Sequence, residues 1–273
     1  MADNRIIYVS QEIAPYLHHS ENARLDRELP QEMQELKYEV RTFMPDFGTI
    51  NERRNQLHEV IRLSGVNIPI RDNDHPLIVK VASMQPSRIQ VYFIDSDDYF
   101  QKQDSDADPF GSNRTDNDER MIFYAHGTMT TAKKLQWDPD VVHVTGWMST
   151  LVPLYLKRLF NDGPSFHHTK VIYTVGPETE IAPLDPDFFE KLKAEGVRKT
   201  DLKPFAEMEL NRTTLHKMAI NWSDGLVFRG LEPDPELVEF AEAAKVPWIQ
   251  IDGETAHGKE LNEFYKSVPL RKA

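Results

Sequence analysis

The chain has 273 residues, of which 40% are apolar, and this is enough material for a sizeable hydrophobic core. Its formal net charge of −12 disfavours contact with phosphate backbones and anionic lipid, so neither nucleic acid nor a membrane is an expected partner. The chain has no cysteine, which excludes disulfides, thiolate metal sites and a cysteine nucleophile. The N-terminal segment lacks a signal-peptide core and no apolar stretch has membrane-spanning length, so a cytoplasmic location is expected.

The first elements predict a parallel sheet. Residues 5–10 (RIIYVS) and 38–44 (YEVRTFM) are short β-rich runs, and apolar residues at helical spacing fill residues 22–36 between them. Strand, helix and strand in this order form a βαβ unit, whose strands lie parallel.

The middle of the chain predicts a small β-rich insertion. Residues 58–69, 76–84 and 88–95 have the composition of successive strands in an antiparallel or mixed arrangement, with a hairpin turn at Asn73-Asp74. Residues 96–116 are polar and rich in aspartate, which predicts a surface loop.

The alternation of strands and helices returns after this loop. We expect helices at 117–135, 148–160, 187–195, 203–219, 235–244 and 259–267, and strands at 141–144, 170–175, 225–228 and 247–251. No internal repeat or linker separates them. The sequence therefore predicts one α/β domain over residues 1–273, with a Rossmann-like, doubly wound, mostly parallel sheet.

Seven segments, in chain order, carry a family resemblance. They are residues 10–16 (SQEIAPY), 38–45 (YEVRTFMP), 92–100 (YFIDSDDYF), 116–121 (DNDERM), 137–143 (WDPDVVH), 151–156 (LVPLYL) and 217–228 (KMAINWSDGLVF). Each is weak alone, but together they resemble the bacterial glycogen synthases and plant starch synthases, and they cover most of the chain.

The resemblance implies the GT-B fold, in which two Rossmann-like domains face each other across a cleft. It also implies ADP-glucose as donor and a growing α-1,4-glucan as acceptor. This chain is similar to the N-terminal domain only. We expect the C-terminal nucleotide-binding domain to be absent, and the glutamate pair E-x7-E of the family occurs nowhere in the sequence. No cofactor and no metal site are expected.

Three motifs of the family's N-terminal domain are replaced here. Its phosphate-contacting K-x-G-G-L becomes residues 18–22 (HHSEN), which loses the lysine charge and both glycines and adds the repelling carboxylate of Glu21. Its H-D-W-H turn becomes residues 145–148 (TGWM), and its T-[IV]-H-N turn becomes residues 174–177 (TVGP). The groups that hold phosphate and stabilise charge are therefore missing from the positions that the resemblance assigns to them.

The remaining candidate residues each have two interpretations. His18, His19 and Ser20 are either a degenerate nucleotide-binding loop or exposed loop residues. Asp116, with Asn117 beside it, either contacts a glucan hydroxyl or caps the following helix in a capping box with Glu119.

The candidate aromatic residues are likewise open to two interpretations. Phe100 and Trp147 either stack on a sugar face or pack inside the domain. His143, on a buried strand, is expected to be a core histidine rather than a catalyst.

The family and the activity lead to different expectations. By resemblance the chain is a glucosyltransferase domain of glycogen metabolism. We expect the chain alone to be inactive and to bind an α-glucan or maltooligosaccharide, a protein partner or a second copy of itself. The alternative is an active glucosyltransferase completed by a separate subunit. An unrelated nicotinamide enzyme is disfavoured because G-x-G-x-x-G is absent.

Overall fold

The computed structural model describes residues 4–17, 20–101, 107–161, 163 and 165–271. The strands are β1 (Arg5–Ser10), β2 (Glu39–Pro45), β3 (His58–Glu59), β4 (Asn67–Ile70), β5 (Asn73–Pro76), β6 (Ile78–Met84), β7 (Ile89–Asp95), β8 (Val141–Thr145), β9 (Lys170–Val175), β10 (Gly225–Arg229) and β11 (Trp248–Ile251). The α-helices are α1 (Glu21–Glu35), α2 (Glu52–Asn55), α3 (Asn117–Lys134), α4 (Val152–Arg158), α5 (Phe188–Ala194), α6 (Lys199–Leu202), α7 (Arg212–Asn221), α8 (Pro235–Ala243) and α9 (Gly258–Ser267). Two 3-10 helices, η1 (Trp147–Ser149) and η2 (Lys203–Phe205), complete the described elements.

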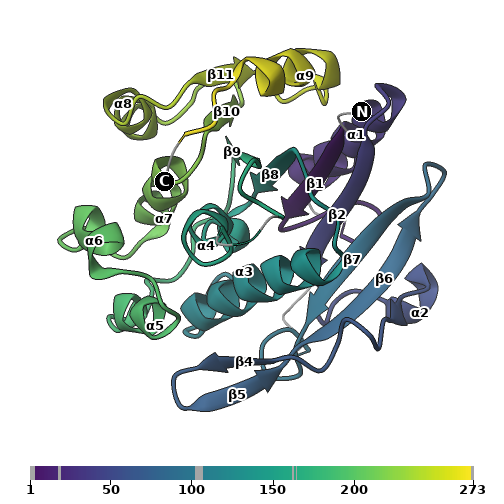
Figure 1. Ribbon diagram of the computed structural model, residues 1–273, viewed down its shortest axis with the longest axis horizontal. Coiled ribbons are helices and arrows are strands. Elements are labelled where there is room, and N and C mark those ends of the chain that lie inside the picture. The colour runs from purple at the N-terminus through teal and green to yellow at the C-terminus, as the bar shows by residue number, and fades with distance from the viewer. Residues whose placement is uncertain (1–3, 18–19, 102–106, 162, 164, 272–273) are drawn as a thin grey trace.

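Nearly all strands of the described chain join one sheet. Its order is β11-β10-β9-β8-β1-β2-β7-β6-β3, and the strands from β11 to β7 run parallel (Figure 1). Only β6 and β3 at one edge are antiparallel to their neighbours. This confirms the predicted α/β fold with a mostly parallel, doubly wound sheet.

The predicted insertion is smaller than expected. The predicted strands at 76–84 and 88–95 are β6 and β7 of the main sheet, and the start of the run predicted at 58–69 is β3 of the same sheet. Only β4 and β5 form a separate hairpin. The predicted hairpin turn at Asn73-Asp74 is wrong. Ile70 pairs with Asn73, and Arg71, in the left-handed region with a φ of 56°, begins the turn. The turn therefore begins two residues before the Asn-Asp pair. Residue types other than Asn and Asp also adopt positive φ, as Arg71 does here, so the Asn-Asp pair was a poor guide to the position of the turn.

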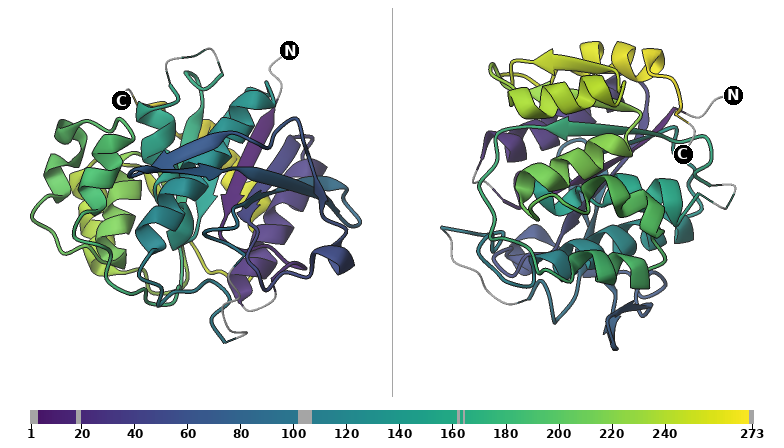
Figure 2. Two further views of the ribbon diagram at one scale, coloured as in Figure 1. Left: turned by 90° about the horizontal axis from the view of Figure 1, so that it is seen from below. Right: turned by 90° about the vertical axis from the view of Figure 1, so that its left-hand side faces the viewer.

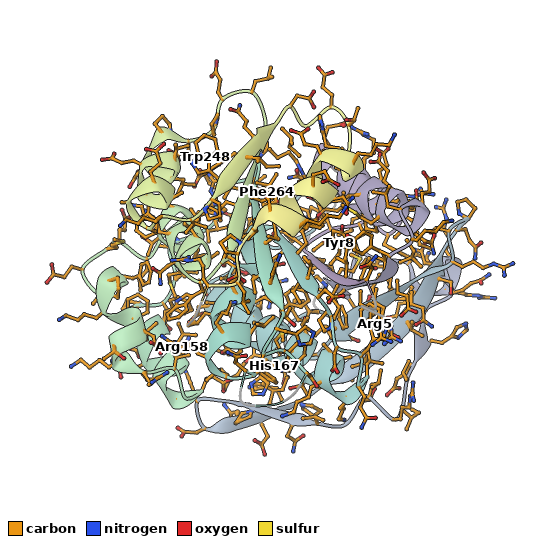
Figure 3. The ribbon with its side chains drawn as sticks, turned by 45° about the horizontal axis from the view of Figure 1, so that its top comes forward. Arg5, Tyr8, Arg158, His167, Trp248 and Phe264 are labelled. Carbon is orange, nitrogen blue, oxygen red and sulfur yellow. The ribbon has the colours of Figure 1, made fainter. Side chains whose placement is uncertain are left out.

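Helices cover both faces of the sheet (Figure 2). On one face α1 and α9 bury an apolar cluster against the strands, and Figure 3 shows Tyr8 of β1 and Phe264 of α9 within this region. On the other face α3, α4 and α7 enclose the larger part of the core. The predicted helix 203–219 is wrong in its first half, where Pro204 follows the end of α6 and a 3-10 turn intervenes before α7.

Helix α9 is fastened to the sheet by polar contacts inside the core. The Tyr265 hydroxyl contacts Nδ1 of His143, and Nε2 of His143 lies 2.6 Å from the Thr174 hydroxyl. Burial lowers the pKa of His143 to about 3, so the imidazole is neutral. His143 is thus the core histidine that the sequence predicts. The segment after α9 is also held, because the backbone N–H of Arg271 donates to the Asp224 carboxylate at 2.6 Å.

Candidate functional site

The strand order changes direction at β1, which has β2 on one side and β8 on the other. In open parallel sheets, ligands bind outside the carboxyl ends of the strands at this switch point. Here the ends of β1 and β8 are closed against each other. Gly146 has a φ of 94°, and a Cβ at this position would lie 2.4 Å from Cβ of Gln11. The Gln11 side chain also accepts the N–H of Met148 at 3.2 Å. A glycine is therefore required at position 146, and Gln11 packs against the turn that follows β8.

Trp147, which follows this turn, is fully buried at the start of η1. Its indole N–H has no hydrogen-bond partner among the described residues. No face of the ring is open to a ligand in this conformation, so its position matches the packing interpretation.

Phe100 and Asn117 lie around one buried arginine. The guanidinium of Arg120 is 5.4 Å from the Phe100 ring centroid and donates to Oδ1 of Asn117 at 2.7 Å. The Asn117 amide donates to the carbonyls of Gly111 and Ser112 at 3.0 and 3.1 Å. Both side chains are buried, and these contacts are with the protein itself. Neither offers a free group to a glucan in this conformation.

Asp116 is the more accessible of the predicted glucan contacts. It occupies the N-cap position of α3, but its side chain makes no capping hydrogen bond, so the capping-box prediction is wrong. Arg114 takes the carboxylate instead, in a two-pronged contact of 2.8 and 2.6 Å. Burial raises the pKa of Asp116, but the hydrogen bonds and charge of Arg114 outweigh burial and hold it below its usual value. Asp116 is therefore an ionised, paired carboxylate.

The degenerate nucleotide loop is described only in part. His18 and His19 lie outside the described residues. Ser20 caps α1, because its hydroxyl accepts the N–H of Ala23 at 3.1 Å. Its hydroxyl is therefore engaged by the helix, although Ser20 also borders the cavities described next.

Three adjoining cavities at the carboxyl ends of β1, β9 and β10 form the candidate site. Their volumes are about 400, 360 and 370 Å³, and all three are bordered by Pro177. We call them together the carboxyl-edge groove, and its lining includes Gln11, Glu12, Ser20, Asn22, Asp108, Phe110, Glu178, Thr179, Arg212, Arg229, Gly230, Asp234 and Gly253. The combined size is that of a site for a drug-sized or oligosaccharide-sized ligand.

Two buried carboxyl groups with raised pKa values belong to the lining of the groove. Burial raises the pKa of Glu178 to about 8, against the opposing charge of Arg212. Burial raises the pKa of Glu12 to about 7, against a hydrogen bond from Ser20. Both carboxylate oxygens of Glu178 and one of Glu12 lack a hydrogen-bond partner of good geometry. Each group therefore holds its proton far more tightly than an ordinary glutamic acid does.

His216 does not supply a compensating charge. Its Nε2 lies 3.7 Å from Oε2 of Glu178, but burial lowers the pKa of His216 to about 3. The imidazole is neutral, and its Nδ1 is 2.6 Å from the Tyr173 hydroxyl.

The two arginines that line the groove, Arg212 and Arg229, are bonded to neighbouring residues of the protein. Arg229 donates to Asn22 at 3.1 Å and to the buried carboxylate of Asp26 at 3.0 Å. Asn22 in turn donates to the carbonyl of Pro177 at 2.8 Å, which ties the loop after β9 to α1. Arg212 contacts the carboxylate of Glu180 and the carbonyl of Glu178. These cations hold three segments together, and their charges are already opposed by carboxylates.

Sequence reasoning missed Asp26, Glu178 and Arg229. Glu178 and Arg229 lie at or just beyond the carboxyl ends of buried strands, where ligand-binding side chains gather, so their positions were a usable signal. Asp26 lies inside α1 and gave no signal of its own. In the described part of the chain, no group of three or more His, Asp or Glu residues is arranged to hold a metal ion. No described helix is both long and apolar enough to cross a bilayer.

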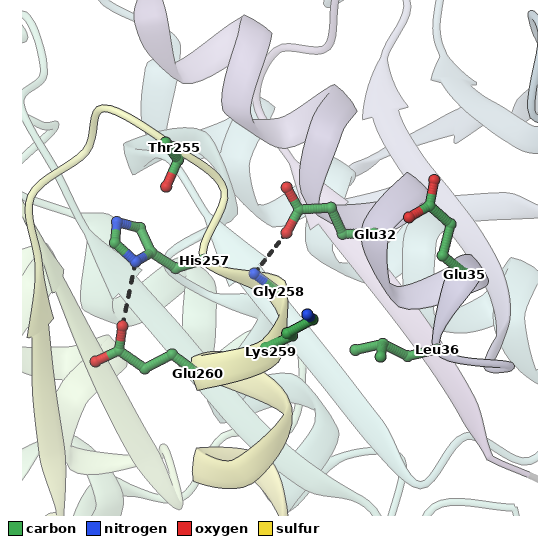
Figure 4. A pocket seen from close by; sticks show the side chains of 8 residues that line it. All are labelled: Glu32, Glu35, Leu36, Thr255, His257, Gly258, Lys259 and Glu260. Atoms are coloured by element: carbon green, nitrogen blue, oxygen red, sulfur yellow. Dashed lines mark hydrogen bonds and ion pairs between the residues drawn. The ribbon is translucent and has the colours of Figure 1, made fainter.

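A separate cavity of about 640 Å³ lies between α1 and the start of α9 (Figure 4). Its carboxylates serve the fold. Glu32 accepts the N–H of Gly258 at 2.6 Å, and His257 contacts Asp252 and Glu260 at 2.7 and 3.1 Å. A Cβ at Gly258 would collide with Glu32, so this contact requires glycine at the helix start.

Comparison with known proteins supports the predicted family. The sequence model of the starch synthase catalytic domain matches residues 5–224. The chain is 35% identical to a glycogen synthase of Chlorobium luteolum over 194 residues, which are 71% of this chain and 40% of that protein. It is 29% identical to a glycogen synthase of Chlorobium phaeobacteroides over 255 residues, which are 93% of this chain and 49% of that protein. The chain thus spans about half or less of the length of these relatives.

A solved structure agrees with the fold. The catalytic domain of starch synthase IV from Arabidopsis thaliana, bound to ADP and acarbose, superposes with a TM-score of 0.68 at 14% identity. The match covers 93% of this chain and 52% of the Arabidopsis chain. The family resemblance found in the seven sequence segments is confirmed, and the chain belongs to the starch synthase catalytic domain family.

Proposed function

We propose that this chain binds an α-glucan or maltooligosaccharide in the carboxyl-edge groove and does not transfer glucose from ADP-glucose by itself. The observation that carries the proposal is the pair of buried glutamates, Glu12 and Glu178, beside arginines that are already paired. Carboxyl groups exchange hydrogen bonds with sugar hydroxyls, and they supply none of the positive charge that a diphosphate requires.

The lost motifs support the same conclusion. Transfer from a nucleotide sugar requires stabilisation of the departing diphosphate, and removing even one such donor from an enzyme slows catalysis by about 10²–10³. In this groove Asn22 and Ser20 stand where the family has a glycine-rich, lysine-bearing loop. Their polar atoms are used to cap α1 and to hold Arg229 and Pro177.

The test compares ligands on one preparation of the 273-residue chain. Acarbose and ADP, both bound in the Arabidopsis structure, and maltoheptaose and ADP-glucose are titrated by calorimetry. We expect heat from maltoheptaose or acarbose and none from ADP or ADP-glucose. Retardation of the chain in native gels that contain glycogen is the second readout, and bovine serum albumin of normal mobility is the control.

Two results contradict the proposal. Tight binding of ADP would show that the groove still accommodates a diphosphate. Incorporation of labelled glucose into glycogen by the purified chain would show that it is an active transferase. Activity of the purified chain would also contradict the alternative of an enzyme completed by a separate subunit, because no such subunit would be needed.

A further inference from the structure

A cavity of about 690 Å³ lies at the antiparallel edge of the sheet and shares no described lining residue with the groove. It is bordered by the loop at Tyr16, by α1, by α2 with β3, and by the strand β6. We call it the arginine pocket, and its polar lining includes Arg27, Arg54, Asn55, Gln56, His58 and Gln85. Its volume suits a small polar ligand.

The charge of this pocket is opposite to that of the protein as a whole. The chain has a net charge of −12, yet none of the twelve described residues that line the pocket is Asp or Glu, and two are arginines. The cavity between α1 and α9, by comparison, is bordered by Glu32, Glu35 and Glu260. On a strongly acidic surface, a carboxylate-free hollow with two guanidinium groups is a local site for an anion.

The two arginines are held in place by different elements. Nη2 of Arg27 donates to the Gln85 carbonyl at 2.9 Å, which fixes one edge of the guanidinium and leaves its other N–H groups for a ligand. Arg54 lies on α2, which is anchored at its start because Asn51 accepts the Arg54 N–H at 2.8 Å. The Glu52 carboxylate, on the same helix, contacts Lys80 at 2.9 Å. The backbone that carries Arg54 is therefore fixed, while its side chain is exposed.

The rest of the lining has the chemistry of a sugar site. The amides of Asn55, Gln56 and Gln85 provide both donors and acceptors, as polyhydroxylated ligands require. Tyr16 adds an aromatic ring, which packs edge-on against Phe93 at 4.8 Å between centroids. We propose that the arginine pocket binds an anionic sugar, a hexose that carries a phosphate group, with Arg54 and Arg27 on the phosphate and the amides on the hydroxyls.

Calorimetry on the full chain tests the proposal with three probes: glucose 6-phosphate, glucose and inorganic phosphate. We expect glucose 6-phosphate to bind at least tenfold more tightly than either of the others. Arg54→Gln is expected to weaken glucose 6-phosphate binding about tenfold, because it removes a charge-assisted contact. Arg53→Gln is the matched control. Arg53 is the preceding exposed residue of α2 and does not line the pocket, so its replacement leaves binding unchanged.

Three outcomes overturn the proposal. Equal affinity for inorganic phosphate and glucose 6-phosphate means an adventitious anion only. Equal effects of Arg53→Gln and Arg54→Gln mean attraction to the surface of α2 rather than a site. Displacement of glucose 6-phosphate by saturating maltoheptaose places the ligand in the carboxyl-edge groove, whereas unchanged binding supports the separate pocket. The groove is tested with maltoheptaose and the arginine pocket with glucose 6-phosphate. The glucan-binding proposal and the pocket proposal can therefore fail independently.

Discussion

The carboxyl-edge groove and the arginine pocket both border α1, yet their charged groups serve opposite purposes. In the groove, Arg229 is buried against Asp26, and the carboxyl groups of Glu12 and Glu178 have buried oxygens without a hydrogen-bond partner among the described residues. In the arginine pocket, Arg54 is exposed on a short, well-anchored helix, and carboxylates are absent from the described lining. The net charge of the chain therefore does not determine the charge of either cavity. That charge depends on which groups line the cavity and on whether they are paired with an opposite charge.

The largest expected effect is a loss of stability when the buried Arg229 is replaced, compared with replacement of the exposed Arg54. Arg229→Met removes the partner of Asp26, whose side chain is 3% exposed, and leaves a buried carboxylate without compensation. We expect a loss of about 3–5 kcal/mol in the free energy of unfolding. Arg54→Met, at the other hollow, is expected to change stability by less than about 0.5 kcal/mol. Urea unfolding monitored by circular dichroism measures both.

A double variant checks the cause of that loss. Arg229→Met combined with Asp26→Leu removes both charges, and an apolar pair of similar volume is often tolerated. The double variant should therefore be more stable than Arg229→Met alone. If it is less stable, the uncompensated carboxylate is not the reason for the loss.

The second expected effect is a pH dependence that arises in the groove. Glu178 has a folded-state pKa of about 8 against an ordinary value of 4.5, so the folded chain keeps a proton that the unfolded chain releases. Its contribution is fully present below pH 4.5 and is lost as pH rises towards 8, by about 1.4 kcal/mol for each pH unit. Glu12, with a pKa of about 7, acts in the same direction.

Glu178→Gln measures this effect directly. The amide keeps the shape of the protonated acid, so we expect a weaker fall in melting temperature between pH 6.0 and 8.5 than in the unmodified chain. Glu207→Gln is the control, since Glu207 is exposed. An unchanged pH slope in Glu178→Gln would contradict the assigned environment of this carboxyl group.

The smallest expected effect concerns the charge of the arginine pocket. Gln56→Glu introduces a carboxylate among the lining residues and should weaken glucose 6-phosphate binding several-fold by repulsion, with little change in stability. Gln136→Glu is a close control, because both glutamines are exposed, follow a helix and have positive φ, 55° and 49°. Similar losses in the two variants would point to general repulsion by an acidic surface rather than to the pocket.

Much of the fold followed from the sequence because the parallel strands are continuous apolar runs. β1, β8 and β9 are buried along nearly their whole length, and such runs are easily recognised. The predictions failed where local pattern was a poor guide. The run at residues 58–69 contains two short strands separated by a turn, and the helix predicted at 203–219 is interrupted by Pro204.

The site was harder to predict, because pairing is a property of the folded chain. Asp26 and Arg229 are 203 positions apart, and neither carries a signal for the other. Phe100 and Asn117 are polar or aromatic residues in family-like segments, which favoured a binding role, but both pack around Arg120. The replacement of the phosphate-binding motifs, by contrast, is a prediction that rests on residue types alone.

The contact between Tyr265 of α9 and His143 of β8 has a consequence for any shortened form of this chain. The family match ends at residue 224, whereas the helix whose Tyr265 meets His143 lies well past that boundary. A fragment trimmed to the matched residues would expose Tyr8, Leu29 and Ile172 to water and strip a partner from a desolvated imidazole. The residues matched by the family model are therefore fewer than those that the folded domain needs, and an expressed fragment should include α9.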